Sequence, residues 1–470
     1  MPRAATLLAV VAALLAALTL FVLTRHNGGT ATSPTRANAF RIAFGSCNKH
    51  DRPQIFWPFM QSRSPSVFAW LGDIIYADKG VVGKWRLPGT LDDTISYFAL
   101  QKARPDYTEF VRHVPAIIGV WDDHDFGKND GDKHFNIGQL HAQYLWDFLD
   151  EPRDSPRRLQ SGVWSSHVFD AHGRRIRIIL LDNRTHRDSH GLFPGVTHDR
   201  DNDAQDMLGE EQWAWLEREL TDTRADVTII GAGVQIVADD KAFEESFSQF
   251  PGSQAKLLSL ISATNTSHVV FISGDVHMAE INAVQCEDMA YAWHDFTSSG
   301  LTHSIATYYP RWFVSVQFAG TRRITPMLLD LNVGEIDIEW DNDFAADAVM
   351  TMRALGSDST VHIEHKIPLS HLQFSSHAPS SDIIDCARAS LHAGLPESCR
   401  RVLHRCDKHA GPRWKWALLS AYPLYFIFAP VCFLMTLFGP IAVMNCPHER
   451  RATWLWVLPF AMFFSLVFNL

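Results

Sequence analysis

Short apolar runs alternate with amphipathic segments through the middle of the chain, between about Phe40 and Leu369. The apolar runs are rich in β-branched and aromatic residues, and several end in a polar cluster; they are FRIAFG, SVFAWLG, AIIGVW, RIRIILLD, DVTIIGAG and HVVFISG. Segments between them, such as EEQWAWLEREL and SQAKLLSLISA, have the spacing of helices with one apolar face. This alternation predicts an α/β domain whose sheets are covered by helices.

Beyond Asp330 the pattern changes to strands alone. The stretches NVGEIDIEW and TVHIEHKIPL predict a terminal meander on one sheet. We therefore place one globular domain at residues 40–372 and interpret residues 373–412 as a linker. Cys386, Cys399 and Cys406 lie in this linker, where an oxidising compartment would allow a disulfide among them.

The two ends of the chain are strongly apolar. Residues 4–24 carry no charge and are long enough to span a bilayer. We interpret residues 1–39 as an uncleaved signal anchor with a short linker; a cleaved signal peptide, with the sequence ANA at 37–39, is the alternative. Either interpretation sends the following domain out of the cytosol, so it would be extracellular or lumenal.

The C-terminal region, residues 413–470, contains two further apolar runs at 416–444 and 454–468. Both are rich in Trp, Phe and Leu, and prolines like theirs are tolerated in membrane helices. Arg450 and Arg451 between the runs indicate a cytosolic turn. We therefore predict a membrane protein with a lipid bilayer as partner, and the alternative is a hydrophobic extension of the domain.

Composition narrows the class of function. The 470 residues have a formal net charge of −10, which disfavours a nucleic-acid partner because phosphate contacts need a basic face. The seven cysteines include no CxxC pair, so the spacing of a zinc ribbon is absent from the sequence.

The stretch WDDHDFGKND, residues 121–130, concentrates acidic side chains directly after an apolar run. Asp122, Asp123, Asp125 and Asp130 would repel one another, and carboxylates are rarely buried unless they are paired or bind a metal. The stretch therefore indicates a bound cation.

Other predicted strands also end in side chains that can bind a metal. Because carboxyl ends of strands in α/β sheets meet at one edge, we expect these side chains to gather there. They are Cys47, Asn48, Asp73, Tyr76, Gln235, Asp275 and His277. Each one alone has a structural explanation, such as a turn or a small buried residue, but together they indicate a functional site.

The residue types fit a two-metal centre, in which two cations about 3.5–4 Å apart hold a phosphoryl group and activate a water. Asp73 suits a bridging carboxylate. An iron-type pocket would use Cys47, Tyr76 and His277, and Asp123 and Asp275 would hold a harder cation such as Ca²⁺, Mg²⁺ or Mn²⁺.

Three further predictions concern the chemistry around the metals. His124 is predicted to donate a proton to the leaving oxygen, with Asp125 orienting its ring. Arg184 is favoured over Arg187 for binding substrate phosphate, because a guanidinium matches phosphate oxygens; the alternative is that one of the two pairs with a nearby Asp. Asn48 and Gln235 complete the predicted substrate site.

The motifs FGSC, LGDIIYAD, WDDHDFGKND, LDNRTHR, SGDVHMAE and TSSGLTHS occur in this order and resemble those of the PhoD-like (alkaline phosphatase D) metallophosphatases of the calcineurin-like superfamily. The resemblance covers about residues 40–303. It implies a four-layer αββα sandwich and a centre of Fe³⁺ and Ca²⁺, with Mn²⁺, Mg²⁺ or Zn²⁺ as other options. It also implies hydrolysis of phosphodiesters and phosphomonoesters outside the cytosol. Cys47, Asp73, Tyr76, Asp123, Asp275 and His277 match ligand positions.

The chain also departs from this family. Bacterial members usually carry a β-sandwich domain before the first metal-binding strand, and here that strand follows the predicted anchor almost at once. Two other functions stay open: a non-catalytic membrane binding protein on the same fold, and a nuclease. Of two glycosylation sequons, the one at Asn183 falls within the expected site and the one at Asn265 is the plausible acceptor.

Overall fold

The structure, a computed structural model, describes residues 39–374 except for 83–84, 136–138, 190–204, 223, 239, 242–243, 286–288, 319, 321 and 341–347. The three predicted membrane segments and the linker lie outside these residues. Within the described part, no helix combines the length and apolar character needed to cross a membrane. The division of the chain into anchor, domain, linker and membrane segments therefore stays a prediction.

The first of two large sheets has six strands in the order β14-β13-β12-β1-β2-β5. Its parallel part consists of β1 (Ala39–Gly45), β2 (Val67–Leu71) and β5 (Ile117–Val120). Its antiparallel part consists of β12 (Asn332–Glu339), β13 (Val349–Gly356) and β14 (Val361–Pro368). The predicted terminal meander is thus present on this sheet, and β13 is a strand that we did not predict.

The second sheet also has six strands, in the order β10-β11-β9-β8-β7-β6. The strands β7 (Arg174–Leu181), β8 (Val227–Ala232), β9 (Val269–Ser273) and β11 (Trp293–Ser298) run parallel. The edge strands β6 (Ser165–Ala171) and β10 (Ala279–Val284) run antiparallel to their neighbours. All six apolar runs quoted above are strands of one or the other sheet, as predicted.

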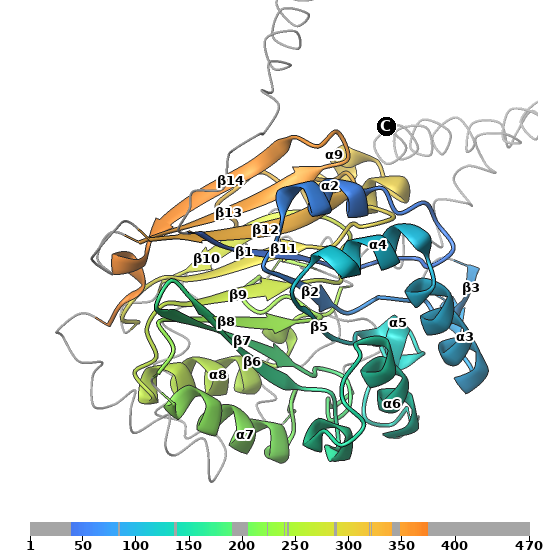
Figure 1. Cartoon of the computed structure of the whole chain (residues 1–470), viewed down its shortest axis with the longest axis horizontal. Helices are drawn as coiled ribbons and strands as arrows, with labels where there is room; N and C mark the ends of the chain where they lie inside the picture. Colours follow the sequence, from blue (N-terminus) through green and yellow to red (C-terminus); the bar gives the residue numbers. More distant parts are fainter. Residues whose placement is uncertain are drawn as a thin grey trace, which may run out of the picture. The chain divides into compact units, whose positions relative to one another are not determined.

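Helices lie beside both sheets (Figure 1). In this view α2 (Phe56–Arg63) and α4 (Pro105–His113) lie near β1 and β2, whereas α7 (Glu210–Thr221) and α8 (Pro251–Ala263) lie together near β6 to β8. The remaining described elements are α3 (Leu91–Lys102), α5 (Asp123–Phe126), α6 (Gln139–Phe148), α9 (Arg311–Gln317), the hairpin β3 (Lys79–Val82) and β4 (Trp85–Leu87), and short 3₁₀ turns. The predicted α/β class is confirmed.

The two sheets pack against each other through apolar side chains. The rings of Phe44 on β1 and Phe296 on β11 meet edge to face with their centroids 5.0 Å apart. At Gly231 on β8, an added Cβ would lie 2.9 Å from the side chain of Leu71 on β2, so the sheets are in close contact there. Each fully buried side chain of this size contributes about 1.5–3 kcal/mol to folding. This packing brings the carboxyl ends of the parallel strands of both sheets together.

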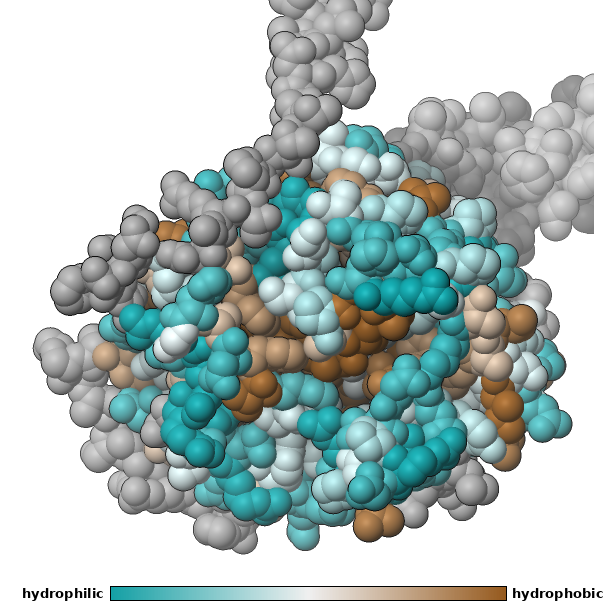
Figure 2. All heavy atoms as spheres, viewed as in Figure 1, coloured by the Kyte–Doolittle hydropathy of each residue, from teal (hydrophilic) through white to brown (hydrophobic). Residues whose placement is uncertain are grey.

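The surface seen from the same direction is mostly hydrophilic, with hydrophobic residues gathered near its middle (Figure 2). Large side chains exposed in the described residues are few and scattered, among them Leu87, Leu159 and Tyr308. Single exposed apolar residues of this kind are normal on a folded protein.

Candidate metal centre

The candidate site lies where the loops after β1, β2, β5, β9 and β11 meet, and glycines allow their close approach. Gly72 follows β2 with φ +79°, and a Cβ there would lie 2.2 Å from the Cβ of Asp122. Gly274 follows β9, and a Cβ there would lie 2.7 Å from the carbonyl oxygen of Leu71 in the other sheet. Only glycine fits at such positions, so the sequence itself permits this convergence.

Four predicted metal ligands have a left-handed backbone, which is uncommon for residues other than glycine. The φ angles are 58° at Cys47, 50° at Asp73, 70° at Asp275 and 57° at His277. Residues are held in such conformations at a cost of about 1–3 kcal/mol each, and they gather at functional sites. The turns after β1, β2 and β9 therefore direct these side chains toward the candidate site, and the left-handed backbone lowers local stability.

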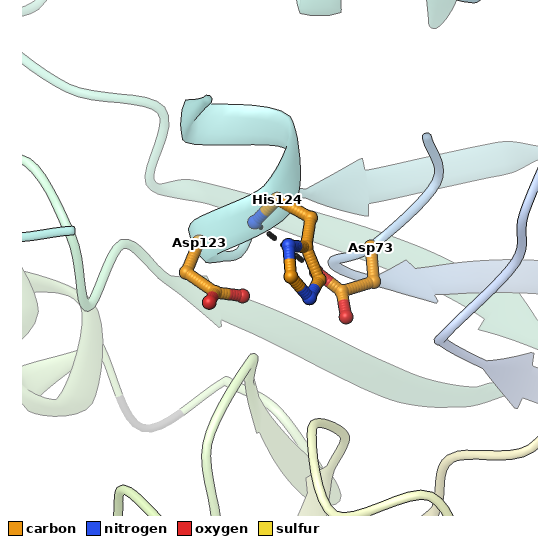
Figure 3. Close-up of side chains that lie close together, drawn as sticks. All are labelled: Asp73, Asp123 and His124. Atoms are coloured by element: carbon orange, nitrogen blue, oxygen red, sulfur yellow. Dashed lines mark hydrogen bonds between the residues drawn. The ribbon is translucent and has the colours of Figure 1, made fainter. Parts of the chain in front are cut away.

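Asp73, Asp123 and His124 form the first of two groups that could hold a metal ion. Their ligand atoms all lie within 4.8 Å of one another, and all three side chains are buried. Asp123 and His124 come from the start of α5 and Asp73 from the loop after β2 (Figure 3). The backbone N–H of His124 also lies 3.4 Å from Oδ1 of Asp73, which joins the two loops.

Asp122, Asp123 and Asp275 form the second group, which shares Asp123 with the first. One carboxylate oxygen of each, Oδ2 of Asp122, Oδ1 of Asp123 and Oδ2 of Asp275, is buried without a hydrogen-bond partner among the described residues. Burial raises the pKa of Asp275 well above its usual value, and nearby carboxylates add to the effect. Buried acceptors without donors fit a site for cations, because a bound cation would satisfy them.

Cys47 and Tyr76 lie against Asp73. The Sγ atom of Cys47 lies 3.3 Å from Oδ2 of Asp73, and the hydroxyl of Tyr76 donates to the same oxygen at 3.0 Å. Burial and the charge of Asp73 raise the pKa of both the thiol and the phenol. Without a metal both groups therefore stay protonated, whereas coordination to a cation would favour their anionic forms.

His277 adjoins this group through Ser299. The hydroxyl of Ser299 lies 2.9 Å from Sγ of Cys47 and accepts a hydrogen bond from the backbone N–H of His277 at 3.0 Å. The Sγ atom of Cys47 lies 3.5 Å from the carbonyl oxygen of Asp275. The structure thus brings the six predicted ligands into one neighbourhood, while their roles as ligands stay a prediction.

His303 belongs to the same neighbourhood, although we did not predict it as a site residue. Its Nε2 lies 2.9 Å from the hydroxyl of Tyr76, and its ring centroid is 4.4 Å from that of His277. The signal that could have found it is the motif TSSGLTHS, which begins with the last two residues of β11.

The orientation of His124 corrects one prediction. Its Nδ1 lies 2.8 Å from Oδ1 of Asp78, so Asp78 and not Asp125 orients the ring. The carboxylate of Asp125 instead accepts hydrogen bonds from the backbone N–H groups of Ile75, at 2.9 Å, and Asp122, at 3.1 Å. It caps the first turn of α5, and each of its two carboxylate oxygens accepts one of these hydrogen bonds. Asp78 ends the motif LGDIIYAD, where it could have been noticed.

The charges around His124 favour its protonated form. Burial lowers its pKa, but the carboxylates of Asp123, Asp73 and Asp78 outweigh this effect and raise it to about 10. Burial raises the pKa of Asp78, but His124 and Arg86 outweigh it, so the net shift is downward. The pair is therefore an imidazolium held by a carboxylate, as expected of a proton donor near anionic groups.

The predicted substrate role of Arg184 stays a prediction, and the structure gives this side chain other partners. The side chain of Arg184 is fully buried and forms ion pairs with Asp122 and Glu245. Arg187 pairs with Glu245 as well, with its Nη1 2.5 Å from Oε1. The structure therefore supports the alternative, ion pairing with an acidic residue, for both arginines. Their positive charges are therefore paired with Asp122, a member of the second acidic group, and with Glu245.

Asn48 and Gln235 also have structural partners, and their predicted substrate contacts stay a prediction. The side-chain amide of Asn48 donates to the carbonyl of Ile74 at 3.0 Å and to Gln101 at 2.9 Å. The amide of Gln235 donates to Glu280 at 2.9 Å and to Thr297 at 2.8 Å. Both side chains are fully buried, because each amide satisfies polar groups inside the domain.

Comparisons with known proteins agree with the motifs. Residues 158–318 match the family model described as PhoD-like phosphatase. No curated protein matches the chain. Among solved structures, the chain is similar to one described as the structure of PhoD, with 14% identity, a TM-score of 0.52 and 78% of each chain covered. It also matches a purple acid phosphatase from yellow lupin, Lupinus luteus, with 14% identity, a TM-score of 0.45, and coverage of 72% of this chain and 55% of the other.

The likeness to PhoD shows the metallophosphatase fold, and the family model covers strands β6 to β11 of the second sheet. The acidic groups at the converging strand ends supply a possible metal site on that fold. The resemblance noted in the sequence is thereby confirmed over residues 158–318, which are similar to the PhoD-like phosphatases, and these findings support a phosphoric ester hydrolase.

Proposed function

We propose that this chain is a membrane-anchored phosphoesterase that hydrolyses phosphodiesters and phosphomonoesters at a two-metal centre. The observation that carries the proposal is the pair of acidic groups sharing Asp123, in which three buried carboxylate oxygens have no hydrogen-bond donor among the described residues. The four-layer αββα arrangement implied by the family is compatible with two sheets that have helices beside each.

Two kinds of ligand support two different cations. One cation, for which Fe³⁺ is our first choice, would be held by a thiolate, a phenolate and an imidazole, those of Cys47, Tyr76 and His277. Asp123 and Asp275 would hold a harder cation such as Ca²⁺, with Asp73 between the two; Mn²⁺, Mg²⁺ and Zn²⁺ are further candidates. When bound, the ions would supply positive charge to the phosphate oxygens and activate a water for attack.

His124 is the proposed proton donor. Its Nδ1 faces Asp78 at 2.8 Å, which leaves Nε2 as the nitrogen that can give its proton to the leaving oxygen. Asp78 holds the ring in this orientation, and Arg86 in turn forms an ion pair with Asp78. The charge on the imidazolium also helps to hold an anionic substrate before the proton moves.

The membrane location rests on the sequence alone. The apolar segments 4–24, 416–444 and 454–468 support anchoring with the domain outside the cytosol. The sequon at Asn265 agrees with this location because Asn265 is exposed, whereas Asn183 is buried and donates to Asp122 at 3.1 Å. Glycosylation at Asn265 and not at Asn183 is therefore part of the proposal.

Turnover of an aryl phosphodiester and of the matching monoester by detergent-solubilised protein tests the function. We expect cleavage of the diester that is lost on chelation and reduced at least a hundredfold in His124→Ala. Cleavage of the monoester alone would keep the centre and change the substrate class. A metal-loaded protein with no turnover of either ester would contradict the proposal and favour a non-catalytic binding protein.

A further inference from the structure

Because Arg184 forms ion pairs with Asp122 and Glu245, we searched for another cation that could bind the substrate phosphate. Arg184 and Arg187 are committed to Asp122 and Glu245, and the buried Lys241 is committed to Asp240 and Glu280. These ion pairs are buried, in side chains that solvent hardly reaches. A substrate arriving from solvent needs a cation nearer the surface.

Lys49 is such a cation. It lies two residues after Cys47, is half-buried, and its Nζ is 4.9 Å from the ring centroid of Tyr76. Within the described residues, the other contact of its ammonium group is the hydroxyl of Tyr308 at 3.5 Å, so its charge is paired with no carboxylate there. This distinguishes Lys49 from Arg86, the other cation beside Tyr76, which is paired with Asp78.

The backbone holds Lys49 in place at the mouth of the site. Its N–H donates to Oγ1 of Thr302 at 2.8 Å, and the N–H of the preceding residue, Asn48, donates to the carbonyl of Asp73 at 2.7 Å. The loop after β1 is therefore tied to the loops after β2 and β11. A long side chain on such a fixed base can reach an anion above the metals without rearrangement of the loop.

Tyr308 supplies a flat apolar surface beside Lys49. Half of its area is exposed, and its ring centroid lies 6.2 Å from that of His303 and 6.3 Å from that of His277. An exposed ring at this distance from His277, a predicted metal ligand, can pack against the alcohol part of an ester whose phosphate lies on the metals.

We propose that Lys49 and Tyr308 form the substrate-binding rim of the metal centre. The ammonium group of Lys49 binds an oxygen of the substrate phosphate, and the ring of Tyr308 packs against the ester group. The rim thus favours phosphate esters of planar, ring-containing alcohols. This inference rests on the proposed function. Lys49 also contributes to the low pKa of His303, after burial and His277, which agrees with its closeness to the site.

The test of Lys49 uses full-length, metal-loaded protein in detergent and two measurements. One is the KM for an aryl phosphodiester, and the other is the Kd for inorganic phosphate from titration calorimetry. Lys49→Met is expected to raise both about tenfold, with kcat changed less than threefold, and Lys49→Arg to restore most of the loss. Lys366→Met on β14, which removes an exposed lysine paired with Glu364, is the matched control and should change neither value.

Metal content and thermal unfolding are measured for each variant. If Lys49→Met lowers the metal content, Lys49→Gln, which keeps a polar end of similar length, replaces it. Values of KM and Kd within twofold of the unaltered protein, at normal metal content, would overturn the role of Lys49. Phosphate binding that depends on Lys49 without turnover by the unaltered protein would support the rim and contradict the proposed function instead.

The test of Tyr308 compares two substrates. Tyr308→Ala is expected to raise the KM for an aryl ester about fivefold and to leave the KM for a methyl ester within twofold. Tyr308→Phe keeps the ring and should leave the preference for the aryl ester unchanged. An equal effect of Tyr308→Ala on both esters would overturn the preference for planar alcohols.

Discussion

Two groups of buried carboxylates in this domain are held in opposite ways. On the first sheet, Glu335 and Asp337 of β12 lie among three arginines. Arg41 reaches Asp337 at 2.6 Å, Arg63 reaches Glu335 at 2.5 Å, and Arg353 reaches Asp337 at 2.6 Å. At the candidate metal centre Asp122 pairs with Arg184, but no described lysine or arginine forms an ion pair with Asp73, Asp123 or Asp275.

The difference teaches how to separate structural from functional acidic groups. Burial raises the pKa of Asp337, but Arg41 and Arg353 outweigh it and the net shift is downward. Burial raises the pKa of Asp73 well above its usual value, since His124 only partly offsets burial and the neighbouring carboxylates. Buried carboxylates that pair with arginines of the same chain stabilise the fold. Buried carboxylates that have no such partner fit a site for a bound metal ion.

The largest expected effect is on activity at Asp73. Asp73→Asn removes the carboxylate between the two proposed metals, so hydrolysis should fall at least a thousandfold, equivalent to about 4 kcal/mol of lost transition-state stabilisation. Turnover of the aryl phosphodiester measures this. The metal-free variant should unfold at the same or a higher temperature, because repulsion among the carboxylates is relieved. Full activity in Asp73→Asn would remove the basis of the proposed metal centre.

The next effect is on stability at Glu335. Glu335→Gln leaves Arg63 and Arg353 without one of their carboxylates, which should lower the free energy of unfolding by about 3–5 kcal/mol. Chemical denaturation of the two variants side by side measures the contrast. The specific activity of the folded Glu335→Gln protein should stay within about twofold. A loss of metal binding in this variant would show that the two groups are not independent.

A smaller effect is expected at Asp78, which is a carboxylate of the metal-centre region that does have cationic partners. Asp78→Asn weakens the orientation of His124, so it should lower turnover about 10–100-fold for esters with an alkyl leaving group. Esters with a nitrophenyl leaving group need less proton donation and should be affected much less. An equal loss for both leaving groups would indicate a structural role for Asp78.

The smallest effect is on the pH dependence of stability. Burial raises the pKa of Asp125 to about 7, so the folded metal-free protein holds a proton that the unfolded chain releases. The resulting stability is complete below about pH 4 and is lost as the pH rises through 7. Asp125→Asn should flatten this slope in denaturation curves of chelated protein. In Asp337→Asn the free energy of unfolding should instead depend less on pH in the acidic range. The reason is that the lowered pKa of Asp337 makes the unaltered protein lose stability on acidification.

The sequence predicted the strands well because their apolar runs are buried on both faces, as in β7, β8 and β9. It also predicted which side chains gather, since carboxyl ends of parallel strands meet whatever the details of packing. β13 was missed although it is a regular strand, because its charged Arg353 interrupts the apolar run VMTMRALG.

The partners of individual polar groups could not be predicted in this way. Asp125 is the neighbour of His124 in the sequence, whereas Asp78 ends a separate motif, LGDIIYAD. The hydrogen bond from the ring of His124 nevertheless goes to Asp78, because Asp125 caps the first turn of α5. Arg184 was predicted to bind phosphate because no partner for it is visible nearby in the sequence. Glu245, with which it forms an ion pair, lies 61 residues further along the chain. Pairing between distant segments is a property of the packed fold and leaves no local pattern.

The loops of the metal centre come from widely separated parts of the chain, since Leu301 binds the carbonyl of Ser46 and Gly274 binds that of Gly233. The second acidic group, which joins Asp122 and Asp123 after β5 to Asp275 after β9, therefore exists only after both sheets have formed and docked, so full metal uptake is expected late in folding. Incorporated metal per molecule is thus a direct gauge of how much of a purified preparation has reached the native state.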